Sequence, residues 1–167
     1  MNADAAFWLA DRALGEQLSV ARTAGLLSNL GLVWMAEALP DQTAQALSAT
    51  GDEAPSGELN TSLTDHCGIG FDEAGALLAE VWQLPSVLRD AIAHQLDPRD
   101  DAPQLSKVVS AAARMVGALR RGQEWGEPDR MLDHLGLSLD DQLEVFALLS
   151  DSKQATVELA ETLFQGR

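Results

Sequence analysis

The sequence predicts an all-α protein, a bundle of about eight or nine helices. Tyrosine is absent, aromatic residues make up 5% of the 167 residues, and helix-favouring residues such as Ala, Leu and Glu dominate. No run of four to eight residues alternates apolar and polar side chains with β-branched enrichment, so a β-sheet has no evident source. Apolar residues instead recur three and four positions apart, which is typical of helices that bury one side.

The first two helices are predicted over Asp4–Leu18 and Ala21–Leu39. The first carries a single apolar stripe, as expected of a helix packed on one side. The second is apolar nearly all round and ends before Pro40, a pattern that predicts a buried helix. We therefore expect it to be the central element of the bundle, with Val33 and Trp34 in the core.

Glycine, proline and serine residues mark where the later helices begin and end. A pair of glycines, Gly68 and Gly70, separates two of them, and Pro85 opens another. Ser138 followed three residues later by Asp141 is a helix-start signature. The predicted ranges are Asp41–Ala49, Glu58–His66, Phe71–Trp82, Pro85–Gln95, Leu105–Leu119 and Asp140–Phe164. One shared core is expected, so the chain is predicted to be a single domain, residues 1–167.

The charge balance restricts the function. With 26 Asp and Glu against 11 Lys and Arg, the formal net charge is −15. Such a surface repels phosphate backbones and anionic lipids, so neither a nucleic acid nor a membrane is an expected partner. The start of the chain lacks the pattern of a signal peptide, and the single cysteine, Cys67, forms no internal disulfide and no cysteine-cluster metal site. A cytoplasmic location is expected.

Four motifs follow one another along the chain. Phe7-Trp8 precedes AGLLSNLG at residues 24–31, a glycine-bounded run over Gly70–Pro85 that ends in WQLP, and AIAHQ at residues 91–95. In this order they resemble the HDOD family (HD-related output domain), a branch of the HD superfamily found in bacterial signalling proteins. The resemblance extends to about Phe164 and implies an HD-like helical bundle. Domains of this family carry further helices before the Phe-Trp pair, so it also implies a shortened member or part of a larger signalling protein.

Catalytic HD enzymes hold divalent cations with His and Asp side chains, because a bound water must ionise near neutral pH. The resemblance places the first His of that set at Ala10, the His-Asp pair at Ser28 and Asn29, and a later His at Glu73. Of two adjacent histidines His94 remains, and its neighbour is Gln95. The last Asp falls at about Ala113.

These replacements imply that neither a metal nor a cofactor is bound. A methyl, a hydroxyl and a carboxamide cannot replace an imidazole–carboxylate pair. Glu73 and His94 are competent ligands, but two protein ligands rarely hold a divalent cation tightly. For Ser28 and Asn29 we expect hydrogen bonds to backbone carbonyls. The alternative is a remnant polar pocket that accepts a small ligand.

Tryptophan and histidine positions give further expectations. Trp8, Trp34 and Trp82 fall on apolar helical positions and are predicted in the core. Trp125 lies in a predicted loop, where an exposed indole is a candidate anchor for a protein partner. For His94 we expect a helix C-terminal cap, with a ligand-binding role in a pocket as the alternative.

The sequence thus favours a non-catalytic regulatory or output module in bacterial signal transduction. It would act through contacts with protein partners in a signalling pathway, with a homodimer as one arrangement. Two alternatives stay open. One is a diverged metal-dependent HD phosphohydrolase that uses Glu73 and His94. The other is a small-molecule, nucleotide-like sensor that uses the vacated metal pocket.

Overall fold

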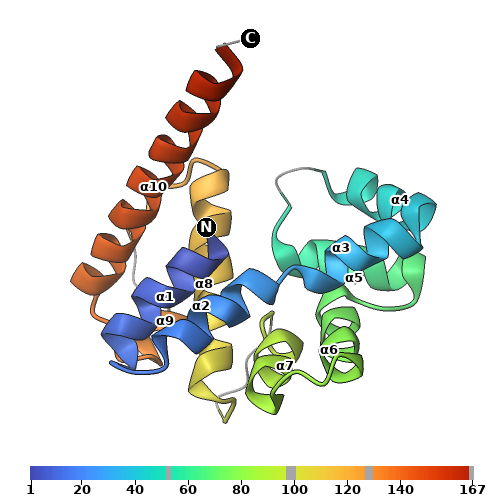
Figure 1. The fold of residues 1–167 in the computed structure, drawn as a ribbon, viewed down its shortest axis with the longest axis horizontal. Coiled ribbons are helices and arrows are strands. Elements are labelled where there is room, and N and C mark those ends of the chain that lie inside the picture. Colours follow the sequence, from blue (N-terminus) through green and yellow to red (C-terminus); the bar gives the residue numbers. More distant parts are fainter. Residues whose placement is uncertain (52–53, 97–100, 127–129, 166–167) are drawn as a thin grey trace.

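The computed structural model describes residues 1–51, 54–96, 101–126 and 130–165. Within these ranges the chain forms helices, turns and loops and no strand, which confirms the all-α prediction (Figure 1). The helices are α1 (Asn2–Ala13), α2 (Leu18–Leu27), α3 (Leu30–Ala38), α4 (Pro40–Thr50), α5 (Ser56–Cys67), α6 (Phe71–Val81), α7 (Ser86–Ala93), α8 (Gln104–Arg120), α9 (Arg130–Asp133) and α10 (Leu139–Gln165).

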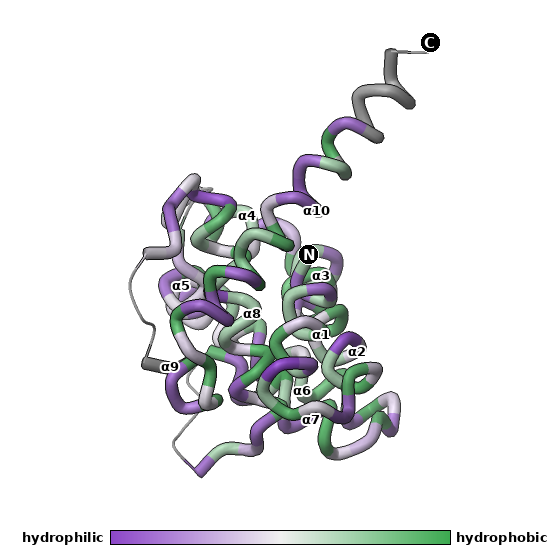
Figure 2. Tube along the Cα trace, turned by 90° about the vertical axis from the view of Figure 1, so that its left-hand side faces the viewer, coloured by the Kyte–Doolittle hydropathy of each residue, from purple (hydrophilic) through white to green (hydrophobic). Residues whose placement is uncertain are grey.

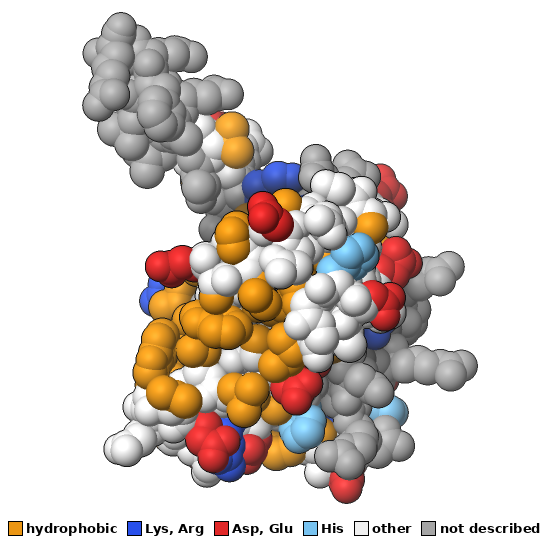
Figure 3. All heavy atoms as spheres, turned by 90° about the vertical axis from the view of Figure 1, so that its right-hand side faces the viewer, with side chains coloured by type: hydrophobic (Ala, Val, Ile, Leu, Met, Phe, Trp, Pro, Cys, Tyr) orange, Lys and Arg blue, Asp and Glu red, His pale blue; other side chains and the backbone are white. Residues whose placement is uncertain are grey.

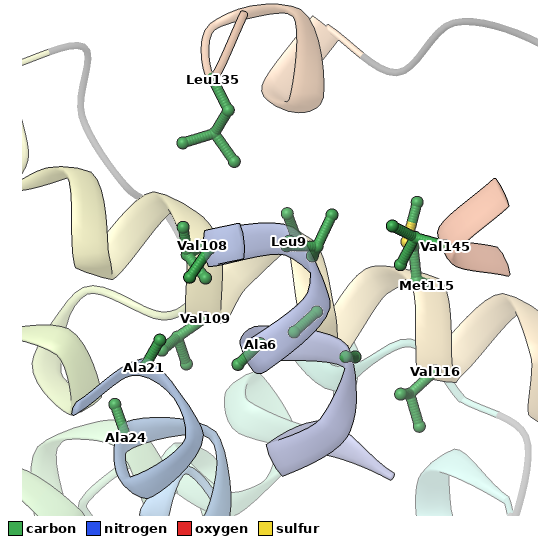
Figure 4. Packing of buried hydrophobic residues seen from close by; sticks show 14 of the residues in the cluster. Ala6, Leu9, Ala21, Ala24, Val108, Val109, Met115, Val116, Leu135 and Val145 are labelled. Carbon is green, nitrogen blue, oxygen red and sulfur yellow. The ribbon is translucent and has the colours of Figure 1, made fainter. Parts of the chain in front are cut away.

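The larger of two hydrophobic cores is built by α1, α2 and α7–α10. Its centre is rich in alanine: Ala6 of α1 and Ala21 of α2 lie beside Val108 and Val109 of α8 (Figure 4). Small side chains let α1, α2 and α8 pack closely, since less side-chain volume separates their backbones. Leu9 is fully buried in this core.

The smaller core lies among α3, α4, α5 and α6. Its buried hydrophobic members are Met35, Ala46, Leu63, Phe71 and Ala74. Buried hydroxyls connect the same helices. Thr43 Oγ1 donates to the Met35 carbonyl at 3.0 Å, and the Ser62 hydroxyl of α5 donates to the Ala46 carbonyl at 3.1 Å.

Two glycines bring α3 and α6 into backbone contact. A Cβ placed on Gly31 would lie 1.9 Å from the Phe71 carbonyl oxygen and 2.5 Å from the Gly75 nitrogen. A Cβ on Gly75 would lie 2.9 Å from Ile92 Cγ2 of α7. Helix α7 also packs on α8 and α2, so it joins the two cores.

The predicted central helix over Ala21–Leu39 is wrong as one element, because it breaks at Ser28 and Asn29 into α2 and α3. The Ser28 hydroxyl donates back to the Gly25 carbonyl at 2.9 Å, a bond that competes with regular helix geometry. The Gln95 amide donates to the Ser28 carbonyl at 2.8 Å. In an unbroken helix that carbonyl would serve the N–H four residues further on.

The predicted burial of α3 and of two tryptophans is also wrong. Val33 is 64% exposed, Trp34 41% and Trp82 55%. Only one side of α3, that of Gly31 and Met35, is buried, so its remaining apolar residues face outward. Trp8, by contrast, is half-buried against the larger core.

The outer helices differ from the prediction mainly at their ends. The first helix stops at Ala13, and a turn with Gly15 at φ +63° leads into α2, where the sequence pattern predicted helix to Leu18. Helix α10 begins after Ser138, as predicted, and extends away from the bundle (Figure 1). Hydrophobic and hydrophilic residues alternate along most helices (Figure 2), in keeping with helices packed on one side. In the described ranges, no helix has the length and apolarity to span a membrane.

Candidate functional site

The break between α2 and α3 is the centre of a buried polar network. Ser28 is 1% exposed and Gln95, just after α7, is 2% exposed. The Ser28 hydroxyl donates to Gly25 O and accepts a hydrogen bond from Asn2 Nδ2 at 3.1 Å. Gln95 Nε2 donates to the Ser28 backbone oxygen at 2.8 Å. The network therefore links α1, the α2–α3 break and the end of α7.

Two adjoining cavities open beside this network. One, of about 330 Å³, has Asn29, Gln95 and Ala113 in its lining. The other, of about 400 Å³, shares Gln95 and Ala113 and extends toward Trp125. Three of the predicted site residues thus meet at one hollow, and Ser28 lies behind it through its bond to Gln95.

The other predicted residues lie elsewhere. Ala10 is fully buried in the larger core on α1. Glu73 is exposed in the first turn of α6, where its backbone N–H is bonded by Asp72 Oδ1. His94 is the half-buried C-terminal cap residue of α7, in the position predicted for it. None of these three is among the residues that line the two cavities.

The donors at these positions do not suit a divalent cation. Ala10 and Ala113 offer methyl groups, and the Ser28 hydroxyl is already committed to a backbone carbonyl. Divalent cations in HD-type sites require several imidazole and carboxylate ligands directed into one cavity. In the part of the chain that the structure describes, no group of three or more His, Cys, Asp or Glu side chains converges to hold a metal ion.

Trp125 is not the exposed side chain that the loop prediction assumed. Its ring stacks on Phe146 of α10 with centroids 5.5 Å apart, and its Nε1 donates to Gln142 Oε1 at 3.2 Å. The indole is half-buried against the larger core. The indole lines the 400 Å³ cavity, so it is not the exposed partner anchor that the sequence predicted.

Basic side chains that the sequence patterns did not indicate line the cavity walls. Arg120 and Arg121, at the end of α8, and Lys153 of α10 all line the 330 Å³ cavity. The adjacent Arg120-Arg121 pair was visible in the sequence, but the whole-chain charge of −15 obscured its significance. That Lys153 joins the pair follows only from the packing of α10 on α8.

An exposed apolar surface on α3 and α6 is a second feature that the sequence patterns did not indicate. We call it the α3–α6 patch and define it by its exposed members, Val33, Trp34, Leu77, Val81 and Trp82. Figure 3 shows the side of the molecule that carries α3–α6, with hydrophobic side chains gathered together and acidic side chains around them. Its signal in the sequence is the apolar composition of α3, which fits an exposed binding surface as well as a buried helix.

Comparisons with known proteins agree with this architecture. A crystal structure named "Putative phosphohydrolase", from Shewanella amazonensis SB2B, superimposes with a TM-score of 0.67 at 22% identity, over 88% of this chain and 56% of that one. This chain therefore spans little more than half the length of that protein, and the likeness at this identity concerns the fold. No curated protein matches the sequence.

The HDOD domain model matches residues 1–98, which is more than half of the 167 residues. The matched segment runs from α1 through α7 and includes the α2–α3 break, the Gly31–Gly75 crossing and Gln95. On this match the chain belongs to the HDOD domain family.

Proposed function

We propose that this domain is a non-catalytic regulatory module of bacterial signal transduction that acts by binding a protein partner. The observation that carries the proposal is the α3–α6 patch. Val33, Trp34, Leu77, Val81 and Trp82 are between 41% and 74% exposed. Large apolar side chains gathered on one side of a soluble protein, as Figure 3 shows here, commonly mark a site where something binds.

The composition of the patch is that of an interface. Tryptophan is the residue most enriched at energetic hot spots, because its large ring excludes water around neighbouring contacts. Trp34 lies in the middle of α3, and Trp82 is the residue that follows the last turn of α6. The backbone contact at Gly31 and Gly75 fixes how α3 and α6 present them. A rigid surface lowers the conformational entropy lost on binding.

The surrounding charge indicates the chemistry of the partner. Glu37 on α3 and Glu73 and Glu80 on α6 are exposed on the helices that carry the patch. A protein surface with apolar side chains flanked by Lys or Arg would complement both the apolar centre and the acidic border. A second copy of this domain would bring its own acidic border against the first.

The donor set around Ser28 and Gln95 supports the non-catalytic part of the proposal. The positions that hold metal in catalytic HD enzymes carry two alanines, and a serine and a glutamine that hydrogen-bond each other through backbone and side chain. The phosphohydrolase reading remains the competing function, and it would have to rely on Glu73 and His94.

A photocrosslinking experiment tests the proposal. A photoreactive amino acid is placed at Val81 in the patch and, as a matched control, at Arg22, which is exposed on α2. We expect the Val81 probe to crosslink a protein in cells and the Arg22 probe not to. The captured protein is then purified, and Val81→Glu is expected to weaken its affinity about tenfold or more while Arg22→Gln leaves it unchanged.

Two results would overturn the proposal. One is that both probes capture the same proteins equally. The other is that the purified partner binds wild type and Val81→Glu with one affinity. Circular dichroism of the variant distinguishes a lost contact from a lost fold, and little loss of stability is expected because Val81 is 74% exposed.

A further inference from the structure

Basic side chains are concentrated around the paired cavities. The chain has 11 Lys and Arg against 26 Asp and Glu. Four of those cations, Arg114, Arg120, Arg121 and Lys153, line the two cavities. Among the described residues of both linings there is no Asp or Glu. In a protein of this composition, a hollow whose described charged lining residues are all cations is the reverse of what the net charge predicts.

Three of these cations have no carboxylate partner within the described ranges. Arg121 Nε donates to the Gln123 side-chain oxygen at 3.1 Å, and Lys153 Nζ donates to the Leu119 carbonyl at 3.2 Å. No ion pair to Arg120 occurs among the described residues. Both bonds are to neutral acceptors, so among the described residues no carboxylate neutralises Arg121 or Lys153.

Arginines elsewhere in the chain behave differently. Arg12 pairs with Glu144 at 3.1 Å and Arg22 with Asp4 at 3.2 Å. Carboxylates are therefore available to neutralise arginine where the fold brings the two together. Arg121 differs from Arg12 and Arg22 because its recorded partner is a neutral oxygen and not a carboxylate.

The backbone adds to the positive potential. Pro55, Ser56 and Gly57, at the start of the 12-residue helix α5, line the 400 Å³ cavity. The first N–H groups of a helix have no intrahelical acceptor, and no side chain caps them at this helix start. A helix N-terminus favours a negative charge, and here it faces the same hollow as the cations.

From these observations we propose that the paired cavities bind a small anion that carries a di- or triphosphate group. Arg120 of α8, Arg121 just after it and Lys153 of α10 hold the phosphate oxygens. The apolar side chains of the 400 Å³ cavity, Leu96 and Trp125, accommodate an organic portion. Volumes of about 330 and 400 Å³ suit a small ligand. This site does not depend on the proposed protein contact, which lies on α3 and α6.

The long-range field of the protein does not prevent such binding. At physiological ionic strength charges are screened over about 8 Å. The repulsion from carboxylates on distant helices is therefore weakened, whereas a cation in direct contact with a phosphate is screened less. A bound anion would also connect α8 with α10, the helix that extends away from the bundle (Figure 1).

Isothermal titration calorimetry on the full chain tests the site. Inorganic pyrophosphate, ATP and adenosine are titrated at low salt in the presence of a chelator. We expect pyrophosphate and ATP to bind at one site and adenosine not to. A tighter Kd for ATP than for pyrophosphate assigns the ligand to the nucleotides, whereas equal values assign the recognition to the phosphate groups alone. Both results support the site.

A double variant and a matched control make the test specific. Arg120→Gln with Arg121→Gln is expected to weaken pyrophosphate binding about tenfold or more. Arg22→Gln with Arg89→Gln removes the same charge from other surfaces and is expected to leave the Kd unchanged. Circular dichroism and the Tm establish that both double variants fold.

The proposal fails if pyrophosphate and ATP do not bind at millimolar concentration and low salt. It also fails if the two double variants weaken binding equally, because that result means nonspecific attraction. Hydrolysis of bound ATP on addition of Mn²⁺ is a separate readout. Such turnover would contradict the non-catalytic function and leave the anion site standing.

Discussion

The two cores of the domain differ in how completely they cover their helices. The larger core, among α1, α2 and α7–α10, buries a long series of small and aliphatic side chains. The smaller core, among α3–α6, buries five hydrophobic residues and leaves Val33, Trp34 and Val81 outside. Similar apolar patterns in the sequence therefore lead to burial in one region and to exposure in the other. The helices of the larger core bury most of their apolar residues, although Leu26 of α2 stays exposed. The smaller-core region carries both exposed tryptophans, Trp34 and Trp82.

The largest effect is expected where the larger core is deepest. Leu9 is fully buried, so Leu9→Ala removes packed atoms and leaves a cavity, and we expect a loss of about 3–5 kcal/mol in the free energy of unfolding. Leu77→Ala in the α3–α6 patch is the matched control. Leu77 is 50% exposed, and we expect it to cost less than about 1 kcal/mol.

Urea denaturation of both variants measures the difference. Equal losses of stability would mean that Leu9 and Leu77 are packed to the same extent, which contradicts the difference between the two regions. A large loss for Leu77→Ala alone would place the dominant packing in the smaller core.

The next effect concerns the crossing that supports the patch. In Gly31→Ala the new methyl group would lie 1.9 Å from the Phe71 carbonyl oxygen, and backbone cannot move aside as a flexible side chain does. We expect a loss of about 3 kcal/mol, at the upper end of the usual cost of overpacking. Gly57→Ala, whose Cβ meets nothing within 4 Å, is the control and is expected to be neutral or slightly stabilising.

Thermal unfolding of the two glycine variants checks this expectation. If Gly31→Ala retains the Tm of the wild type, α3 and α6 do not touch through their backbones. The Gly31–Gly75 contact would then not fix the positions of the patch residues.

A smaller effect is expected at the connection between the two regions. Gln95→Leu keeps the side-chain volume but leaves the buried Ser28 carbonyl without its 2.8 Å hydrogen bond. An unsatisfied buried acceptor costs about 1–3 kcal/mol. Gln45→Leu on the exposed side of α4 serves as the control, with little change expected. Urea denaturation of the two variants measures this cost. Equal urea midpoints for both would show that the Gln95–Ser28 hydrogen bond does not stabilise the fold.

The smallest effect belongs to the start of α10. The Ser138 hydroxyl and backbone N–H donate to Asp141, and these bonds lower the pKa of the Asp141 carboxyl below 3.8. A lowered folded-state pKa stabilises the protein above the unfolded value and loses that contribution as the pH falls through the folded value. Asp141→Asn is therefore expected to lower the Tm at pH 7 and to match the wild type in strong acid.

The cap makes a second variant informative. Ser138→Ala removes the hydroxyl that bonds the Asp141 N–H at 3.2 Å, and we expect a cost of about 1 kcal/mol. The Tm of the two single variants and the double variant, measured from pH 7 to pH 2, tests the coupling. Strictly additive losses at pH 7 would show that the two side chains do not act together.

Local patterns predicted the parts of the fold that depend on local chemistry. The helix start at Ser138 and Asp141, the end of α7 at His94 and the helix over Phe71–Val81 all follow from neighbouring residues. The break at Ser28 depends on Gln95, 67 positions further along the chain, and periodicity does not register such a contact. Likewise, the apolar sequence of α3 predicted that the helix is buried, but it does not show whether other helices of this chain bury it.

The candidate site was predictable to the same extent. The family resemblance correctly predicted that Asn29, Gln95 and Ala113 lie at one cavity, because members of a family share the arrangement of their helices. It placed Glu73 and His94 in the same set, whereas neither lines the cavity. The cations of α8 and α10 were missed because Arg120 and Lys153 become neighbours only through packing.

Phosphodiester hydrolysis tests most directly whether the domain works by binding or by catalysis. The full chain is assayed with bis(p-nitrophenyl) phosphate and added Mn²⁺, beside His94→Ala. The account predicts no turnover above that of buffer with Mn²⁺ alone, for either protein. Saturable turnover by the wild type that disappears in His94→Ala would contradict it.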